Sequence, residues 1–471
     1  MIQYDYLLSI ALVALLGLCA DATRAAERPN FIFMLSDDQG WNGLSVAMHP
    51  DVASSKGEIF QTPNLERLAS QGMRFSSAYA PAPVCSPTRI SLQTGKSPAQ
   101  LHWTKAAPAV AGRKLTEPRG IKDLSKEEIT IGELLRKAGY ATAHYGKWHI
   151  AGGGPGVHGY NEHDGDTGNE NAFKYTDPNP VDIFGMAERA TKFMEKSQQA
   201  NKPFYIQLSW NALHAPELAM KATQAKYEKY ASQSNSKQVA TAAITEDLDS
   251  GVGKVLEAVE RLRLSKNTYI IYMSDNGSGG GSKRGGIRGG KGSVWEGGIR
   301  VPLIVRGPGV SENSWCHTPV VGYDLFPTFC ALAGIPETEL PNGIEGGSIT
   351  SLLHNSGEGS VRRKREEIVF HFPHYQSDDG PHSAIRLGNL KLLHFYEDDR
   401  VALFDLAKDI GERNDEAQRM PREVQMLKGR LDQYLLAINA QLPTPNSNFD
   451  PSLPAAPRKS GKNGKKGADK K

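Results

Sequence analysis

The chain has 471 residues, which is too long for one small hydrophobic core, so we expect one large domain and a smaller one. Apolar residues make up 39% of the sequence and charged residues 23%, which is typical of a soluble globular protein. The net charge of +3 arises at the two ends, because residues 458–471 carry +6 and residues 1–22 carry −2, which leaves −1 on the remainder. This balance does not indicate nucleic-acid binding, and we expect no nucleic-acid partner.

Residues 1–22 have the pattern of a secretory signal peptide. Residues 7–18 form an apolar run that suits the core of a signal peptide and is short for a membrane span. Ala20-Asp21-Ala22 offers a cleavage site, although the residues before the run include Asp5 and no Lys or Arg. We therefore expect export to the periplasm or the extracellular space, and no stable membrane span.

The first predicted strand, 29–35, is an unbroken apolar run of the kind that is buried on both faces of a parallel sheet. Asp37 and Asp38 follow it. Two adjacent carboxylates repel each other, so at the end of a buried strand they need a cation. Oxygen ligands favour a hard ion such as calcium or magnesium. The alternative is an acidic turn on the surface.

The segment 83–89 predicts the start of a helix that can bind an anion. Ser86 fits the N-cap position, and Pro87 fits the first helical position. Cys85 would then lie at the helix mouth, where free N–H groups and the helix dipole favour an anionic group. Arg89, one turn later, adds a cation that can bind tetrahedral oxygens. The alternative is a buried cysteine without a chemical role.

Helices and strands alternate through the next part of the chain, as in an α/β sheet. The predicted elements are helix 62–72, helix 130–139, strand 140–144, helix 182–195, strand 203–210, helix 241–264, strand 268–273, strand 301–305 and helix 323–334.

Polar residues follow three of these strands. Lys147 and His149 follow strand 140–144, and on an extended segment they point to the same side. His214 follows strand 203–210, at the position where α/β enzymes gather their ligands. Each of these three could equally be a surface or loop residue. Asp275 and Asn276 follow the next strand and could complete the cation site begun after the first one.

The glycine-rich stretch 277–298 carries Lys291 and other basic residues. Such a composition is common in flexible linkers. Its place between two predicted strands favours an ordered loop with its backbone close to an anionic ligand.

The composition changes after Asn355. Short alternating segments predict an antiparallel sheet, and a helix at 422–438 closes it. We expect a main domain over 27–355, a smaller α+β subdomain over 356–442 and a disordered basic tail over 443–471. The predicted strands of the subdomain are 368–372, 383–387, 391–396 and 402–405. Elsewhere, Cys316 and Cys330 could form a disulfide in an oxidising compartment or remain two buried thiols.

From Cys85 to Arg89 the chain reads C-x-P-x-R, and together with the four other polar stretches it resembles the type I sulfatases. In that family the motif cysteine is oxidised to Cα-formylglycine (3-oxoalanine), an aldehyde. The resemblance covers about 29–412. It implies an alkaline-phosphatase-like α/β fold, with a large, mostly parallel sheet flanked by helices and a smaller C-terminal subdomain.

The resemblance also implies an activity and its partners. The protein would be an exported sulfuric ester hydrolase that acts on a sulfated carbohydrate, with aryl sulfates as further substrates. A formylglycine-generating or equivalent maturation enzyme would be needed to modify Cys85. The hydrated aldehyde would attack sulfur, and its second hydroxyl would then expel sulfate.

Individual roles carry over by position. The ligands of Ca²⁺, with Mg²⁺ as a second possibility, would be Asp37, Asp38, Asp275, Asn276 and the modified Cys85. The catalytic and sulfate-binding groups would be Arg89, Lys147, His149, His214 and Lys291. His149 would act as the base, and His214, assisted by Lys291, would protonate the departing oxygen.

Two other functions stay open at this point. One is a phosphomonoester, phosphodiester or phosphonate hydrolase of the same superfamily. Such relatives commonly use Ser or Thr with two zinc ions, which the Cys85 motif and a single oxygen-rich site argue against. The other is a non-catalytic glycan-binding relative, which the complete set of polar groups argues against.

Overall fold

The computed structural model describes residues 28–279 and 286–452. Its centre is an eight-stranded sheet with the order β10-β2-β9-β8-β1-β7-β5-β6. Its strands are β1 (Asn30–Ser36), β2 (Met73–Phe75), β5 (Ala141–Gly146), β6 (Glu162–His163), β7 (Phe204–Ser209), β8 (Thr268–Ser274), β9 (Leu303–Arg306) and β10 (Ser314–Cys316). Strand β9 runs antiparallel to β2 and β8, and the other neighbours pair in parallel. The predicted mostly parallel α/β sheet is confirmed.

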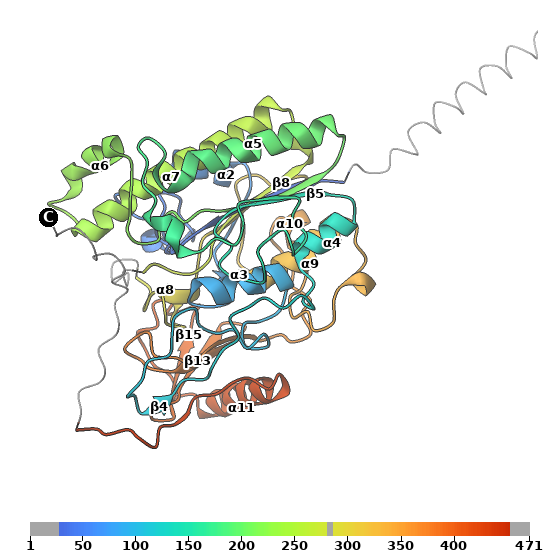
Figure 1. Cartoon of the computed structure of the whole chain (residues 1–471). Coiled ribbons are helices and arrows are strands. Elements are labelled where there is room, and N and C mark those ends of the chain that lie inside the picture. The colour runs from blue at the N-terminus through green and yellow to red at the C-terminus, as the bar shows by residue number, and fades with distance from the viewer. Residues whose placement is uncertain (1–27, 280–285, 453–471) are drawn as a thin grey trace, which may run out of the picture.

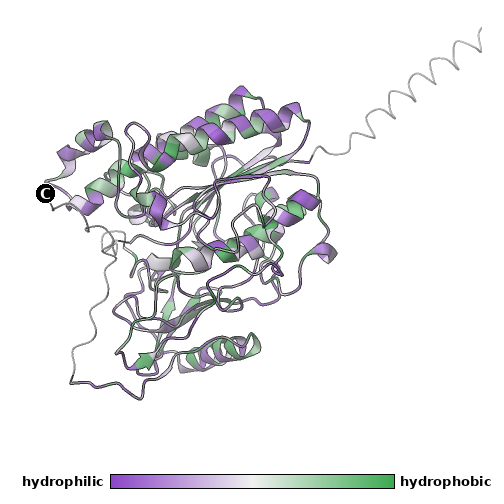
Figure 2. Ribbon diagram, in the orientation of Figure 1, coloured by the Kyte–Doolittle hydropathy of each residue, from purple (hydrophilic) through white to green (hydrophobic). Residues whose placement is uncertain are grey.

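Helices cover both faces of this sheet, so the main body has three layers (Figure 1). One face carries α2 (Pro63–Ser70), α5 (Ile183–Gln199), α6 (Lys221–Tyr227) and α7 (Ser236–Arg261), and the other carries α3 (Cys85–Thr94), α4 (Ile131–Lys137), α9 (Leu325–Leu332) and α10 (Thr350–His354). The alternation of side chains along β1 supplies both cores: Ile32 and Met34 join one, and Phe31, Phe33 and Leu35 join the other. Figure 2 shows purple and green alternating along the outer helices α5 and α7, as expected where one helix face is solvated.

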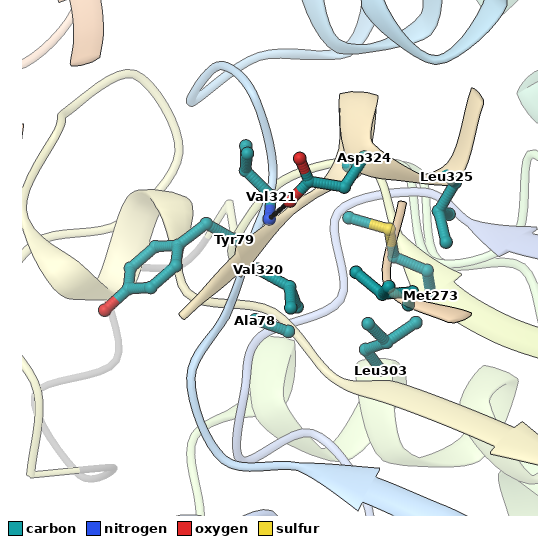
Figure 3. A pocket seen from close by; sticks show the side chains of 10 residues that line it. Ala78, Tyr79, Met273, Leu303, Val320, Val321, Asp324 and Leu325 are labelled. Atoms are coloured by element: carbon teal, nitrogen blue, oxygen red, sulfur yellow. Dashed lines mark hydrogen bonds between the residues drawn. The ribbon is translucent and has the colours of Figure 1, made fainter. Parts of the chain in front are cut away.

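Two small sheets tie loops to this body. Strand β3 (Ala78–Tyr79) pairs with β11 (Val320–Val321), and β4 (Leu115–Thr116) pairs with β16 (Thr444–Pro445). Figure 3 shows β3 and β11 lying over Met273 of β8 and Leu303 of β9 around a small apolar pocket. Beside this pocket the Asp324 carboxylate accepts a hydrogen bond of 2.8 Å from the Val321 amide.

The C-terminal part forms a second, antiparallel sheet, as predicted. Its strands, in spatial order, are β12 (Ile368–Phe372), β13 (His382–Leu387), β14 (Leu390–Phe395) and β15 (Arg400–Asp405). Helix α11 (Pro421–Ala437) packs on one face of this sheet through Leu427, Leu431 and Leu435. The opposite face packs against Trp295 and Ile299 of the short helix α8 (Glu296–Ile299) and its N-cap.

Short 3-10 segments complete the described secondary structure. They are η1 (Ala53–Ser55), η2 (Asn169–Phe173), η3 (Pro180–Asp182), η4 (Glu228–Tyr230), η5 (Ser265–Asn267), η6 (Gly322–Asp324) and η7 (Glu337–Glu339).

The structure differs from the sequence-based expectations at two helix or chain ends. Helix α3 starts at Cys85 itself with Val84 as N-cap, so the prediction of Ser86 as N-cap is wrong by two residues. The prediction of a disordered tail from 443 is wrong at the start of the tail, because β16 pairs there with β4. This pairing uses backbone groups and needs no side-chain core. The predicted signal peptide 1–22 and the tail from 453 lie outside the described residues.

Two further findings bear on the sequence-based expectations. Cys316 and Cys330 are buried free thiols, so the disulfide alternative is wrong. Within residues 28–279 and 286–452, the helices are either too short or too polar to cross a bilayer.

A buried ionic network joins the second sheet to the main body. The Lys391 ammonium on β14 lies 2.8 Å from Glu296 Oε1 and 2.7 Å from Glu412 Oε1, and all three side chains are fully buried. The Glu296 amide donates to the other Glu412 oxygen at 2.6 Å, and Arg300 pairs with Glu296 at 2.6 Å. Burial raises the pKa of Glu412 to about 7, with Lys391 opposing the rise and Glu296 adding to it.

We expect Lys391→Met to lower the free energy of unfolding by about 3–5 kcal/mol, because it leaves two buried carboxylates without their shared cation. Urea unfolding followed by circular dichroism measures the change. The double variant Lys391→Met/Glu412→Gln should recover part of the loss, since Glu412 no longer carries a charge and Glu296 keeps its pair with Arg300. Lys428→Met, which removes a lysine from a solvated pair with Asp432, is the matched control and should leave the transition in place. Equal effects of the two single variants would contradict this account.

Candidate functional site

Two neighbouring strand ends bring the predicted oxygen ligands together. Strands β1 and β8 pair in parallel with Ser36 opposite Ser274, so the residues after them leave the sheet at the same edge. Asp37 and Asp38 follow β1, and Asp275 and Asn276 follow β8. The Asp38 amide donates to Asp275 Oδ1 at 3.2 Å, and the Asn276 side-chain amide donates to Asp38 Oδ1 at 2.8 Å.

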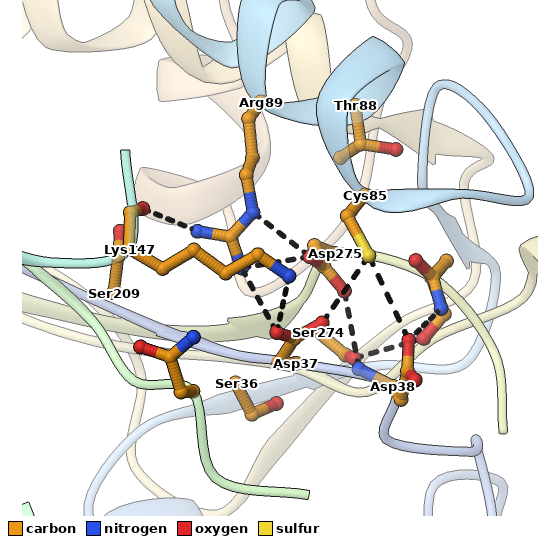
Figure 4. Close-up of polar contacts among 12 residues, drawn as sticks. Ser36, Asp37, Asp38, Cys85, Thr88, Arg89, Lys147, Ser209, Ser274 and Asp275 are labelled. Atoms are coloured by element: carbon orange, nitrogen blue, oxygen red, sulfur yellow. Dashed lines mark hydrogen bonds and ion pairs between the residues drawn. The ribbon is translucent and has the colours of Figure 1, made fainter. Parts of the chain in front are cut away.

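Cys85 reaches this edge from the first turn of α3. Its sulfur lies 3.3 Å from Asp37 Oδ1 and 3.9 Å from Asp38 Oδ1. One ligand atom each from Asp37, Asp38, Cys85 and Asp275 lies within 4.8 Å of the others. Figure 4 shows Cys85 and Arg89 descending from the same helix toward the three carboxylates.

Three cationic side chains, from α3, from the segment after β5 and from the glycine-rich stretch, pair with these carboxylates. Arg89 holds Asp275 Oδ2 through Nε at 3.0 Å and Nη2 at 2.7 Å. The Lys147 ammonium, which follows β5, lies 2.5 Å from Asp37 Oδ2. The Lys291 ammonium lies 2.6 Å from Asp38 Oδ1 and 3.3 Å from the Cys85 sulfur. The site therefore carries three negative and three positive side chains.

Burial and the neighbouring charges both shift the pKa values of the site's groups, and which effect is larger differs from one group to the next. Burial by itself would raise the pKa of Asp37, but Lys147 and Arg89 hold that pKa well below its usual range. The pKa of Asp275 rises to about 6, because burial and the neighbouring Asp37 together exceed the effect of Arg89. The pKa of Lys291 lies well above its usual value, since Asp38 outweighs burial.

The residues present fit a divalent cation. Asn276 Oδ1 is buried and has no hydrogen-bond partner, although the amide nitrogen of the same side chain donates to both Asp38 and the Gly277 carbonyl. An unpartnered buried oxygen next to three carboxylates is the donor set that a hard cation prefers. The cluster can thus hold a metal ion with ligands from β1, β8 and α3.

The two histidines lie at the same sheet edge without contacting the acidic cluster directly. His149 donates its backbone N–H to Thr167 O at 2.7 Å, and its ring Nδ1 is buried without a partner. Burial, with Lys147 and Arg89 adding to it, lowers its pKa to about 2, so the imidazole is neutral at pH 7. His214 follows a segment tied to β1 by the hydrogen bond from the Asp37 amide to Ala212 O. Burial lowers the pKa of His214, with Asp37 opposing.

The ring of His214 has a defined tautomer. Its Nδ1 lies 2.8 Å from the Ala215 carbonyl oxygen, which can only accept a hydrogen bond, so Nδ1 carries a proton. In the neutral ring Nε2 then has none, and this nitrogen can give a proton to another molecule only when the ring is an imidazolium.

The glycine-rich stretch is ordered where it is described. A Cβ added at Gly277 would lie 1.9 Å from Gly297 O, and one added at Gly298 would lie 2.0 Å from Ser293 O. The glycines therefore serve close backbone packing, which brings Lys291 to the site. Lys283 and Arg284 lie outside the described residues, and Arg288 stacks its guanidinium over the Trp295 ring at 3.7 Å.

Sequence reasoning missed the residues that support the site. Glu296, Arg300, Lys391 and Glu412 were not singled out, although the i,i+4 spacing of Glu296 and Arg300 at the end of the glycine-rich stretch was a usable signal. Thr167 was also missed. It receives the His149 amide on its carbonyl, and its hydroxyl donates to Gly146 O at 2.5 Å.

Comparison with known protein families gives two matches. The family model described as Sulfatase matches residues 29–335, and the model described as N-sulphoglucosamine sulphohydrolase, C-terminal, matches residues 290–441. Among curated proteins, human arylsulfatase A is 27% identical over 498 aligned positions, covering 89% of this chain and 91% of the relative. N-acetylgalactosamine-6-sulfatase of Rattus norvegicus is 30% identical, covering 72% of this chain and 68% of the relative.

Solved structures agree in fold. The crystal structure of Ps i-CgsB in complex with k-i-k-neocarrahexaose superposes with a TM-score of 0.71 at 25% identity, covering 87% of this chain and 93% of that one. The PsFucS1 sulfatase from Pseudoalteromonas sp. gives a TM-score of 0.67 at 22% identity, covering 92% and 94%.

We expect Cys316 and Cys330 to resist alkylation by iodoacetamide in the folded protein at pH 7.5. Burial raises the pKa of Cys316 to about 11 and that of Cys330 to about 12, so the reactive thiolate is scarce in both. Denaturation without any reductant should expose both to rapid labelling, which peptide mass spectrometry reads out. Failure to label after denaturation, reversed by a reductant, would indicate a disulfide and contradict the structure.

Proposed function

The chain belongs to the sulfatase family, whose members are sulfuric ester hydrolases, and from that membership we propose that it removes sulfate from a sulfated carbohydrate using a formylglycine made from Cys85. One observation carries the proposal: the motif cysteine and Arg89 of the same helix lie in one buried cluster with three carboxylates and two lysines that come from distant parts of the chain. The relatives support the substrate class. One of them is named for N-acetylgalactosamine-6-sulfate hydrolysis, and one solved structure holds a neocarrahexaose.

We assign the metal to the acidic cluster. Asp37, Asp38, Asp275 and Asn276, with the modified residue 85, would hold Ca²⁺, or Mg²⁺ in its place. The bound ion would neutralise negative charge on the sulfate group and polarise its oxygens.

The three cations would bind and orient the sulfate group. Lys291 lies within 3.3 Å of the Cys85 sulfur, so its ammonium can contact a group that reacts there. Arg89 and Lys147 add two more positive charges near residue 85. Both are buried, and a buried environment strengthens electrostatic attraction. This arrangement follows the logic of phosphoryl transfer, in which positioning and charge stabilisation supply most of the catalysis.

The two histidines divide the proton transfers. His149, neutral and with an unpartnered buried nitrogen, would accept a proton at the position of residue 85. His214, with Lys291 close by, would give a proton to the departing alcohol oxygen. That role needs the imidazolium form, which Asp37 and Asp38 favour against burial.

The remaining assignments concern maturation and organisation. Conversion of Cys85 to the aldehyde is an oxidation, so it requires a separate maturation enzyme that supplies its own oxidant. We propose export directed by residues 1–22, to the periplasm or the extracellular space. We also propose a catalytic domain over 27–355 with a C-terminal subdomain over 356–442.

We expect protein from its native host to contain an aldehyde at residue 85 and to hydrolyse 4-nitrophenyl sulfate faster than 4-nitrophenyl phosphate. Mass spectrometry of the peptide that contains residue 85 tests the first point, and paired initial rates test the second. The Cys85→Ala variant should lose at least 10³-fold in sulfatase rate, because nucleophile removal leaves only binding and charge effects (a loss on the order of that in other nucleophile knockouts). An unmodified thiol in active protein, or a faster phosphatase rate, would favour the phosphoester hydrolase alternative.

Screening sulfated mono- and oligosaccharides with defined sulfate positions would identify the sugar. Glycan binding without turnover in protein that contains the aldehyde would support the non-catalytic alternative.

We expect Ca²⁺ to stabilise the folded protein by about 2.7 kcal/mol at a hundredfold excess over its Kd. Thermal unfolding with increasing calcium measures the effect, and isothermal titration calorimetry gives the Kd. The Asp275→Asn variant should lose most of the stabilisation, because it removes one ligand charge at little cost in shape. Asp51→Asn, which changes an exposed aspartate, is the matched control and should respond to calcium as the wild type does. A calcium response that is equal in both variants would overturn the assignment of the metal to this cluster.

A further inference from the structure

A cavity of about 440 Å³, lined by both polar and apolar residues, lies beside the proposed catalytic site, under the loop from 167 to 182. Its floor includes Gly146 and Asn211. Gly146 ends β5 immediately before Lys147, and Asn211 lies two residues after β7 and three before His214. The cavity thus adjoins the site along the carboxyl edge of the sheet, where α/β proteins bind their ligands.

Part of the cavity wall is fixed by internal contacts. The Arg189 guanidinium lies 2.9 Å from Asp164 Oδ2 and 2.6 Å from Asp182 Oδ2. Asn179 donates to Asp182 at 3.0 Å and accepts from the Phe184 amide at 2.8 Å. These contacts hold the loop against α5 and give the cavity a defined shape.

Other groups on the wall could contact a bound molecule. Arg189 Nε is buried and makes no hydrogen bond. Asn171, Lys174 and Thr176 also line the cavity. Asn171 is half-buried, whereas Lys174 and Thr176 are exposed, so water meets the hydrogen-bonding capacity of their side chains. A molecule bound in the cavity could replace that water with contacts to an amide, an ammonium, a hydroxyl and the buried Arg189 Nε–H.

The charges of the wall indicate the class of ligand. Asp164 and Asp182 offset Arg189 and Lys174, so the lining is close to neutral. A strongly anionic group would meet two carboxylates there, and an apolar group would leave the polar side chains unpaired. A neutral, hydroxyl-rich ring can both donate to the carboxylates and accept from the amide, ammonium and guanidinium groups.

We propose that this cavity is a subsite for an unsulfated sugar unit that neighbours the sulfated unit in the substrate chain. This inference rests on the proposed function, because it assigns the neighbouring position in the same carbohydrate. The subsite favours sulfated oligosaccharides over sulfated monosaccharides, through binding and not through the chemical step.

The kinetic test uses Asn171→Ala and Lys174→Ala in the full-length protein, with 4-nitrophenyl sulfate, sulfated monosaccharides and sulfated tetrasaccharides of the chondroitin and carrageenan types as substrates. Each variant should raise KM for the preferred tetrasaccharide about tenfold, the loss expected for roughly one good hydrogen bond, with kcat unchanged. Activity on the monosaccharide and on 4-nitrophenyl sulfate should not change. Lys192→Ala is the matched control, because Lys192 is exposed on α5 and pairs with Glu188.

A binding test separates this inference from the proposed function. Unsulfated tetrasaccharides of the same types are titrated into the Cys85→Ala protein by calorimetry, and the titration is repeated with Lys174→Ala added. Binding that the added substitution weakens supports the subsite even if the wild type hydrolyses no sulfate ester. The inference is overturned by an absence of binding, by binding that Lys174→Ala leaves unchanged, or by equal kinetic losses on all three classes of substrate.

Discussion

The Asp37 carboxylate lies between the Lys147 ammonium and the Arg89 guanidinium, and the rest of the site is arranged around this buried contact. Carboxylates are costly to remove from water unless they are paired, and here each partner comes from a different element: β1, the end of β5 and α3. The site therefore forms only when the parallel strands are in register and α3 is docked. Its geometry is a consequence of the sheet topology, because the carboxyl ends of β1, β5, β7 and β8 meet at one edge.

The buried network of Glu296, Lys391 and Glu412 has the same character and extends the constraint to the C-terminal antiparallel sheet. Lys391 belongs to the second sheet, while Glu296 begins the helix that ends the glycine-rich stretch. The backbone of that stretch is held at both ends of its described part, by Lys291 N to Ser278 O at 3.0 Å and by Gly297 N to Arg288 O at 2.7 Å. The position of the Lys291 ammonium thus depends in part on the C-terminal antiparallel sheet, through the contacts of Glu296 with Lys391 and Glu412.

Much of this arrangement follows from the sequence, and the exceptions have physical causes. The strand ends at Asp37 and Asp275 were predictable, because apolar runs of strand length followed by acidic residues place carboxylates at one sheet edge. The register that brings them together was not, since it depends on nonlocal pairing. The start of α3 was misplaced because the Ser-Pro signal at Ser86 and Pro87 also fits the second and third positions of a helix that begins at Cys85. The sequence gives almost no indication of the Lys391 network, because a lysine in an alternating strand is expected to be solvated until its buried partners are known.

The cavity beneath the 167–182 loop could not be predicted from the sequence, for a different reason. Its lining comes from a segment rich in Asn, Asp and Gly that has neither helical nor strand periodicity, so the sequence indicates a loop and nothing about its shape. Loops of this kind can vary while the scaffold stays fixed. If the proposed subsite is correct, the sulfate group and the sugar are recognised by separable parts of this chain.

The charge count of the site supports the proposal that it holds a cation. Three carboxylates and three cationic side chains cancel, so the protein alone offers little net attraction for an anion. A divalent cation would bring the sum to +2. That charge exceeds the single negative charge of a sulfate monoester and matches the two charges of released sulfate. Electrostatic attraction would then strengthen as the ester is cleaved. This lowers the activation free energy of the chemical step and makes release of sulfate slower.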